Sequence, residues 1–203
     1  MKNTILLILL LNFSCSSPLD IKLEEDTDVL SIYNKKEISS LKLIVDFYDA
    51  FIMKNTKQQQ INLAYHEYFE SIRNVNSFED LINHIRLTPD DLKFLINDLK
   101  ICGTFDEIWQ YEYGINYKTK DTISVCIIPN TQGKYMRLLK LLGQSNDYLE
   151  VYANSIQECV CIPPSIAVGF QHNHNEFDFQ KEVNRLIFAI HYITIISEEK
   201  YKK

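Results

Sequence analysis

The sequence predicts an α+β fold of predominantly α character, in which a helical, bundle-like domain carries one central β-hairpin. Apolar residues recur at three- and four-residue spacing over most of the chain, as they do in amphipathic helices. Near the middle the period changes to two, where aromatic and β-branched residues flank a polar turn. Helix start and stop signals divide the helical part into about six or seven segments.

The first two helices are expected to form an antiparallel pair. Residues 38–52 and 61–72 both place apolar side chains three and four positions apart, with charged residues between them. The polar stretch at 55–60 separates the two segments, and a short connection of this kind is typical of neighbouring antiparallel helices.

Two further helices are predicted before the hairpin. Ser77 and Asp80 indicate the start of a short one. The sequence Thr-Pro-Asp-Asp at 88–91 combines a capping hydroxyl, a proline for the first turn and acids that suit the positive helix end. That helix is expected to stop at Gly103.

The hairpin is predicted from strands at 108–117 and 122–128, joined by the polar turn at 118–121. Pro129 is expected to close it because proline cannot donate to a strand ladder.

Helices are expected again after the hairpin. One covers 135–142 and ends at Gly143, and Ser145 begins the next. The Pro-Pro pair at 163–164 breaks the chain, and a polar loop is expected after it. Residues 179–193 contain the longest apolar helical stripe, so we expect the last helix to be central to the core.

The N-terminus has the three parts of a secretory signal peptide. Lys2 supplies a basic charge, residues 5–11 are an unbroken aliphatic run, and small polar residues follow around Cys15. We therefore predict a signal peptide at 1–14. A membrane span needs about 20 apolar residues, and this run is too short for one.

The position of Cys15 directly after Ser14 resembles the lipobox of bacterial lipoproteins. Asn12 and Phe13 depart from that family's pattern, and the resemblance covers only the signal region. It implies that Cys15 is the site of lipid attachment and becomes the new N-terminus. The alternative is cleavage at the small residues Ser14 and Ser16, which would release a secreted soluble protein.

The rest of the chain divides into a tether and one domain. Residues 15–36 are rich in acids and poor in large apolar residues, so they are predicted to be an acidic tether that holds the domain away from a bilayer. Residues 37–203 are predicted to be a single α-rich globular domain, which their length allows.

Composition excludes several functional classes. The formal net charge is −6, which disfavours a nucleic-acid partner. The sequence contains no Gly-x-Ser-x-Gly turn, no glycine-rich phosphate loop and only five glycines. We therefore favour a non-catalytic protein without a cofactor, although distant residues can still assemble an active site.

Four cysteines follow Cys15, and an oxidising compartment allows them to form a disulfide. Their spacing leaves the pairing open, and buried free thiols are the alternative. The four residues are Cys102, Cys126, Cys159 and Cys161.

One local cluster contains the residue types of a metal site. His172, His174 and Glu176 could present three ligands to Zn²⁺ or a similar ion if the backbone is extended. The alternative is that Asn175 caps the last helix while both histidines lie in a solvated loop. The cysteine pair at 159 and 161 could complete a four-ligand site, but its spacing is shorter than structural zinc sites use.

The other histidines have no local catalytic pattern. His66 and Glu67 open like the helical zinc-protease motif, but Glu70 stands where that motif needs a second histidine. His84 and His191 are expected to be structural.

Export, the lipid anchor and the missing catalytic signatures together favour an envelope-anchored binding protein. Its expected partners are the membrane, through the lipid, and another protein or a cell-surface ligand. One form is an immunity-type protein that neutralises a basic toxin, because acidic surfaces steer basic partners. The alternatives are an envelope hydrolase, metal dependent or not, and a carrier of a small apolar ligand.

Overall fold

The computed structural model describes residues 20–85, 87, 89–115, 119–120 and 122–199. The predicted signal peptide at 1–14 and Cys15 therefore lie outside the described residues. Within these ranges, no helix combines the length and the apolar character that crossing a bilayer requires.

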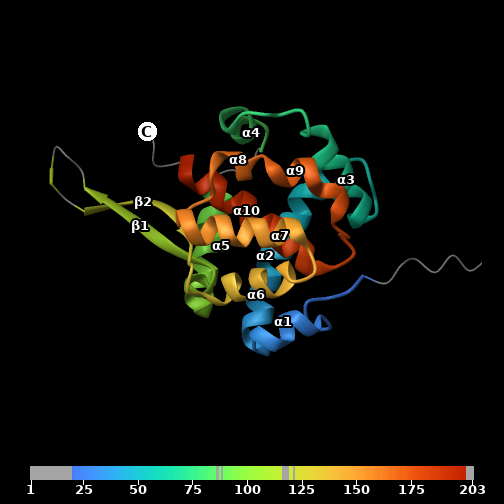
Figure 1. Ribbon diagram of the computed structural model, residues 1–203, viewed down its shortest axis with the longest axis horizontal. Coiled ribbons are helices and arrows are strands. Elements are labelled where there is room, and N and C mark those ends of the chain that lie inside the picture. The colour runs from blue at the N-terminus through green and yellow to red at the C-terminus, as the bar shows by residue number, and fades with distance from the viewer. Residues whose placement is uncertain (1–19, 86, 88, 116–118, 121, 200–203) are drawn as a thin grey trace, which may run out of the picture.

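The fold is predominantly α-helical with a single two-stranded antiparallel sheet in the described part of the chain, which confirms the predicted class (Figure 1). Before the hairpin lie α1 (Thr27–Ile32), α2 (Lys35–Lys54), α3 (Ile61–Ser71), α4 (Phe78–His84), α5 (Pro89–Cys102) and the 3-10 turn η1 (Phe105–Glu107). The hairpin consists of β1 (Trp109–Ile115) and β2 (Thr122–Pro129). After it lie α6 (Lys134–Gly143), α7 (Asp147–Cys159), α8 (Pro164–Ala167), α9 (Gly169–Asn173), the 3-10 turn η2 (His174–Glu176) and α10 (Glu182–Glu199).

Local signals set most helix boundaries. Ser77 caps α4 by accepting the backbone N–H of Asp80, as the sequence predicts. Gly103 follows α5 with φ +77°, a left-handed conformation that glycine adopts without a steric penalty. The start of α7 differs by one residue from the prediction, because Asn146 and not Ser145 is its cap.

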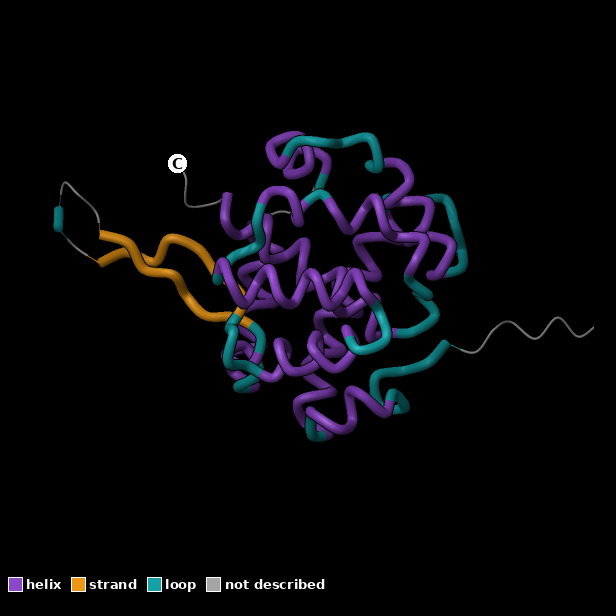
Figure 2. Tube along the Cα trace, viewed as in Figure 1, coloured by secondary structure: helices purple, strands orange, loops and turns teal. Residues whose placement is uncertain are grey.

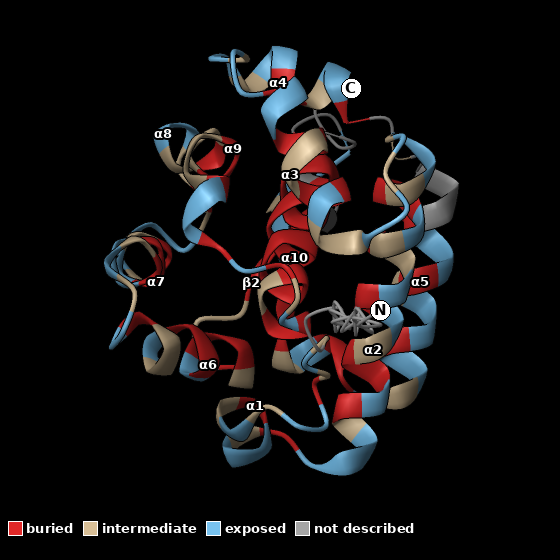
Figure 3. Cartoon of the chain, turned by 90° about the vertical axis from the view of Figure 1, so that its right-hand side faces the viewer, coloured by how far each residue is buried: buried red, intermediate tan, exposed pale blue. Residues whose placement is uncertain are grey.

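Helix α10 is the centre of the core, as its apolar stripe predicts. Its residues from Leu186 to Ile196 are all buried, and its N-terminal half packs along α2. Figure 3 shows α10 enclosed by the other helices, with buried residues facing it. It begins at Glu182, three residues later than the predicted stripe, because Asp178 accepts the N–H of Lys181 in a turn just before it.

The hairpin is anchored at its base and extends away from the helices (Figures 1 and 2). Trp109, paired with Pro129, is fully buried and donates its indole N–H to Thr194 of α10 at 2.8 Å. A β-bulge between Glu112 and Tyr113 interrupts the ladder farther along. The predicted strands are thus confirmed within the described residues.

The predicted acidic tether is wrong from residue 20 onward. Ile21 forms a parallel bridge with Lys181, and Leu23 and Val29 are completely buried. Acid-rich composition suggested a solvated segment, but Leu23, Val29 and Tyr33 have places in the core, while Ile21 and Leu30 are exposed. The globular domain therefore includes residues 20–36, which the prediction assigned to the tether.

The polar loop predicted after the Pro-Pro pair is also wrong, since this stretch forms α8, α9 and η2. Pro164 occupies the first turn of α8, where its missing N–H costs nothing. Phe170 and Gln171 of α9 are completely buried. This segment is therefore part of the core.

A buried ionic cluster joins the two ends of the domain. The guanidinium of Arg185, with only 1% of its side chain exposed, lies 2.9 Å from Asp20, 3.3 Å from Asp49 and 3.4 Å from Glu182. Glu182 also accepts the backbone N–H of Leu23 at 3.0 Å. The cluster thus connects the N-terminal segment with α2 and α10.

Asp49 makes this cluster sensitive to pH. Burial raises the pKa of Asp49 to about 6, although Arg185 and a hydrogen bond from Tyr65 oppose that shift. The folded state then binds a proton more tightly than the unfolded chain between about pH 4 and pH 6. Stability is therefore lost as the pH rises through this window, by up to about 3 kcal/mol.

We expect the substitution Asp49→Asn to remove this loss of stability with rising pH. The amide stays neutral at every pH and can still accept from Tyr65, so the variant should be at least as stable as the wild type at pH 7.5. Urea unfolding at pH 4.5 and 7.5 measures the effect. Asp98→Asn, which changes an exposed carboxylate on α5, is the control and should behave like the wild type. Parallel pH dependence of wild type and Asp49→Asn would contradict the assignment.

Candidate functional site

The predicted metal ligands do not come together. His172 lies in α9 while His174 and Glu176 lie in η2, and a helical backbone turns alternate residues in different directions. His174 is buried and Glu176 is exposed. The assumption of an extended backbone was therefore wrong. Among the described residues, no group of three His, Cys, Asp or Glu side chains is arranged to hold a metal ion, with or without the cysteine pair.

His174 instead belongs to a hydrogen-bonded chain that we call the histidine relay: Glu70, His174 and His66. The Nε2 atom of His174 lies 3.1 Å from Oε2 of Glu70. Its Nδ1 atom lies 3.1 Å from Nδ1 of His66. A buried imidazole therefore connects an exposed carboxylate with a half-buried imidazole, across more than 100 residues of sequence.

The chemistry of the groups assigns the protons in the relay. An ionised carboxylate only accepts, so Nε2 of His174 carries its proton and Nδ1 of a neutral His174 accepts. His66 must then donate from Nδ1, which leaves its Nε2 with a lone pair. The hydrogen bond from His174 lowers the pKa of Glu70, and burial and His174 lower that of His66. The charges and tautomers are therefore mutually consistent at neutral pH.

The relay can hold His66 in one tautomer, but it does not resemble a metal site. The ring centroids of His66 and His174 lie 5.3 Å apart, while their Nδ1 atoms are 3.1 Å apart. These two distances place the nitrogens nearly head-on along one line, so their lone pairs do not converge on a common ion. The described hydrogen bonds of the relay include no serine or cysteine nucleophile.

The other histidines have structural contacts. His191 is completely buried between the Tyr152 hydroxyl and the carbonyl of Ala167, both at 3.1 Å. Burial lowers its pKa to about 3, so it is neutral. His84 donates from Nδ1 to the carbonyl of Asp80 at 2.7 Å. Both agree with the structural role that the sequence suggests.

The cysteines are distributed over separate elements. Cys102 and Cys159 end α5 and α7, and both thiols are free. Cys126 donates its thiol to Glu112 at 3.1 Å, and Cys161 follows α7. A disulfide that includes Cys102 or Cys159 is thus absent from the described structure, and the predicted pairing stays a prediction.

An accessible apolar feature lies on β1, in the projecting part of the hairpin. Tyr113 is 64% exposed and Ile115 is 61% exposed, and we call this pair the hairpin surface. Nearer the base, the ring of Tyr111 is covered by the ammonium group of Lys100 at 4.5 Å and stacks on Phe105. The ring of Tyr113 contacts that of Tyr111, with 6.1 Å between centroids, and still leaves most of its surface exposed.

The sequence predicted the hairpin but not its exposed surface. That surface could have been expected because only two strands were predicted, and a two-stranded sheet without a third strand leaves both faces partly open. Alternation alone would instead assign one face to the core.

We expect Glu70→Ala to allow both tautomers of His174, because the carboxylate that accepts the hydrogen bond from its Nε2 atom is lost. Nitrogen-15 shifts of the ring atoms at pH 7.5 should show single tautomers in the wild type and a mixture in the variant. Glu67→Ala is the matched control, since Glu67 on the same helix bonds Lys57 and Gln58 instead. An identical spectrum for wild type and Glu70→Ala would refute the proton assignment.

Comparisons with known proteins give no family assignment. No protein-family model matches the chain, and no curated protein or solved structure is significantly similar to it. Evidence for the function therefore comes from the geometry of the described residues, above all from the hairpin surface.

Proposed function

We propose that this is a non-catalytic, envelope-anchored binding protein whose β-hairpin contacts another protein. The observation that supports this most is the projection of the hairpin, with Tyr113 and Ile115 exposed, from a body whose other large apolar residues are mostly buried. Aromatic side chains are enriched in the centres of protein interfaces.

The energetics of the hairpin support the same proposal. A two-stranded ribbon is at best marginally stable in water by itself. Here its base is held by Trp109 against Thr194 and by the hydroxyl of Ser197, which donates to the carbonyl of Ile127 at 3.3 Å. The ribbon is therefore presented in one orientation, and such preorganisation lowers the entropy cost of binding.

The position of the N-terminus favours a protein partner over the bilayer. The blue N-terminal end of the described chain and the projecting end of the hairpin lie on opposite sides of the molecule (Figure 1). Cys15 and Asp20 are five positions apart in the sequence, which gives a reach of at most about 18 Å. An anchor at Cys15 would thus direct the hairpin away from the membrane.

The charge favours a basic partner. The formal net charge of −6 attracts cationic proteins over long distances and raises their association rates. This agrees with an immunity-type protein that neutralises a basic toxin. The alternative of a hydrolase at His172, His174 and Glu176 has less support, because the helical backbone separates these residues.

We expect the double variant Tyr113→Ser/Ile115→Ser to lose its partner. Loss of two interface anchors should reduce recovery of the partner protein at least about tenfold, which corresponds to about 1.4 kcal/mol of binding free energy. The measurement is quantitative mass spectrometry after cross-linking and affinity purification from solubilised envelope. The control is Phe94→Ser/Ile101→Ser on α5, whose side chains are 75% and 76% exposed. Unchanged recovery with the hairpin variant, or the same loss with the control, would count against the proposal.

We expect Cys15→Ser to move the protein from the membrane fraction to the soluble fraction, because no acyl chain can be attached. Fractionation and intact mass measure the result. Cys159→Ser, which changes an exposed free thiol, should leave the distribution unchanged. A wild-type protein that carries no acyl mass would end the lipoprotein hypothesis and favour secretion in soluble form.

A further inference from the structure

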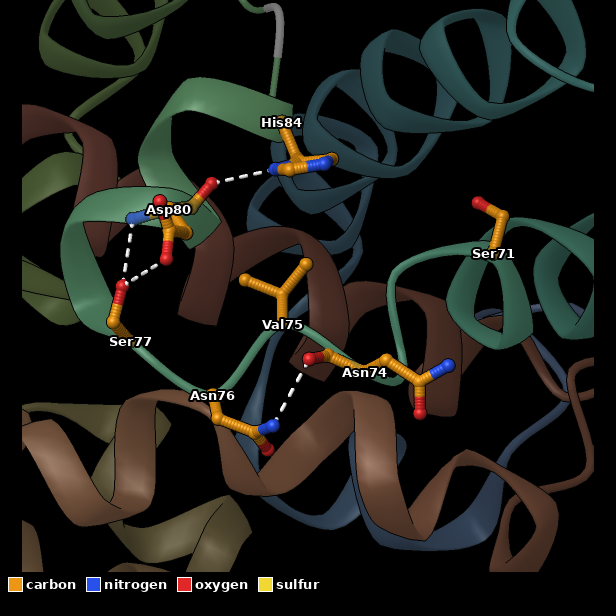
Figure 4. A pocket seen from close by; sticks show the side chains of 7 residues that line it. All are labelled: Ser71, Asn74, Val75, Asn76, Ser77, Asp80 and His84. Atoms are coloured by element: carbon orange, nitrogen blue, oxygen red, sulfur yellow. Dashed lines mark hydrogen bonds between the residues drawn. The ribbon is translucent and has the colours of Figure 1, made fainter.

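A second surface feature lies at the connection between α3 and α4, and we call it the polar hollow. It has a volume of about 540 Å³ and is lined by Ser71, His84, Asp80 and residues 74–77 (Figure 4). Its size is within the range of small-molecule sites, about 300–1,000 Å³. It is wide and open, so it suits a ligand that stays partly hydrated.

The side chains around the hollow have unused hydrogen-bonding groups. His84 donates from Nδ1 to Asp80, so its Nε2 atom has a free lone pair, and Figure 4 shows that nitrogen facing the open space toward Ser71. Ser71 donates to the carbonyl of Tyr68 and can still accept. Among the described hydrogen bonds, the side-chain amide of Asn74 makes none. Donors and acceptors are therefore both available.

The base of the hollow is held in place from inside the core. The carbonyl of Val75 accepts a hydrogen bond of 3.1 Å from the side-chain amide of Gln171, which is completely buried. The hydroxyl of Tyr192 on α10 donates in turn to Gln171 at 3.1 Å. On the other side, Ser77 and Asp80 form the cap of α4. The lining is therefore preorganised and does not need to order on binding.

The lining chemistry limits the class of ligand. Among the described residues, no lysine or arginine lines the hollow, so these residues offer a phosphate or carboxylate ligand no counter-charge. Val75 is the one apolar side chain in the described lining, so an aliphatic ligand would gain little from burial against it. Hydroxyl groups both donate and accept, and they match a mixture of amide, hydroxyl and imidazole groups.

We propose that the polar hollow binds a neutral sugar of one or two rings. This goes beyond the proposed protein contact, because the hollow and the hairpin surface share no residue. The lining contains no Tyr, Trp or Phe for stacking, so affinity depends on hydrogen bonds and is expected in the millimolar range, with a Kd of about 1–10 mM.

The test is an NMR titration of the mature protein with glucose, galactose, N-acetylglucosamine and its disaccharide. At least one of these sugars should shift the resonances of His84 and Asn74. His84→Phe and Asn74→Leu, both at exposed positions, should weaken binding at least about fivefold. Asn97→Leu, an exposed amide on α5, is the control and should bind like the wild type.

Glucose 6-phosphate and decanoate are the competing probes. The proposal predicts weaker binding of the phosphorylated sugar than of glucose, and no decanoate binding at the hollow. It is overturned if none of the sugars shifts these resonances at 50 mM, if decanoate binds there in their place, or if both variants bind as well as the wild type.

Discussion

The guanidinium of Arg185 is the group on which the arrangement of both chain ends depends. A buried cation is tolerated only when carboxylates and hydrogen bonds compensate for its lost hydration. Asp20 comes from the N-terminal segment, Asp49 from α2 and Glu182 from α10 itself. Loss of the N-terminal segment would remove Asp20 from the guanidinium and leave its charge less compensated in the interior. Burial still raises the pKa of Asp49, so the cluster compensates the charge of that carboxylate only in part.

This ionic cluster also shows a limit of prediction from the sequence. Helices and the hairpin were predictable because their signals are local: an apolar period, a capping serine at 77, a glycine at 103. The packing of residues 20–33 was not, because the partners of Asp20 and Leu23 are about 160 residues away. The acids that suggested a solvated tether are in part the ligands of a buried arginine.

The same limit applies to the candidate site. The sequence identified His174 as a candidate metal ligand, but in the structure His174 forms hydrogen bonds with other residues. The prediction added His172 and Glu176 because it assumed an extended backbone, whereas the helical turns α9 and η2 point these side chains in different directions. His66 and Glu70 lie one helical turn apart on α3 and meet His174 across the core. Their spacing indicated only a broken zinc-protease motif, since nothing local indicates the third member.

The docking of residues 20–23 onto α10 has a consequence for biogenesis. Synthesis runs from the N-terminus, so these residues leave the ribosome long before the helix that receives them. The ionic cluster cannot form until Arg185 and Glu182 have been made, about 160 residues later, so docking of this segment is a late step in folding. A chain truncated before α10 would leave residues 20–23 without a docking place and open to proteolysis.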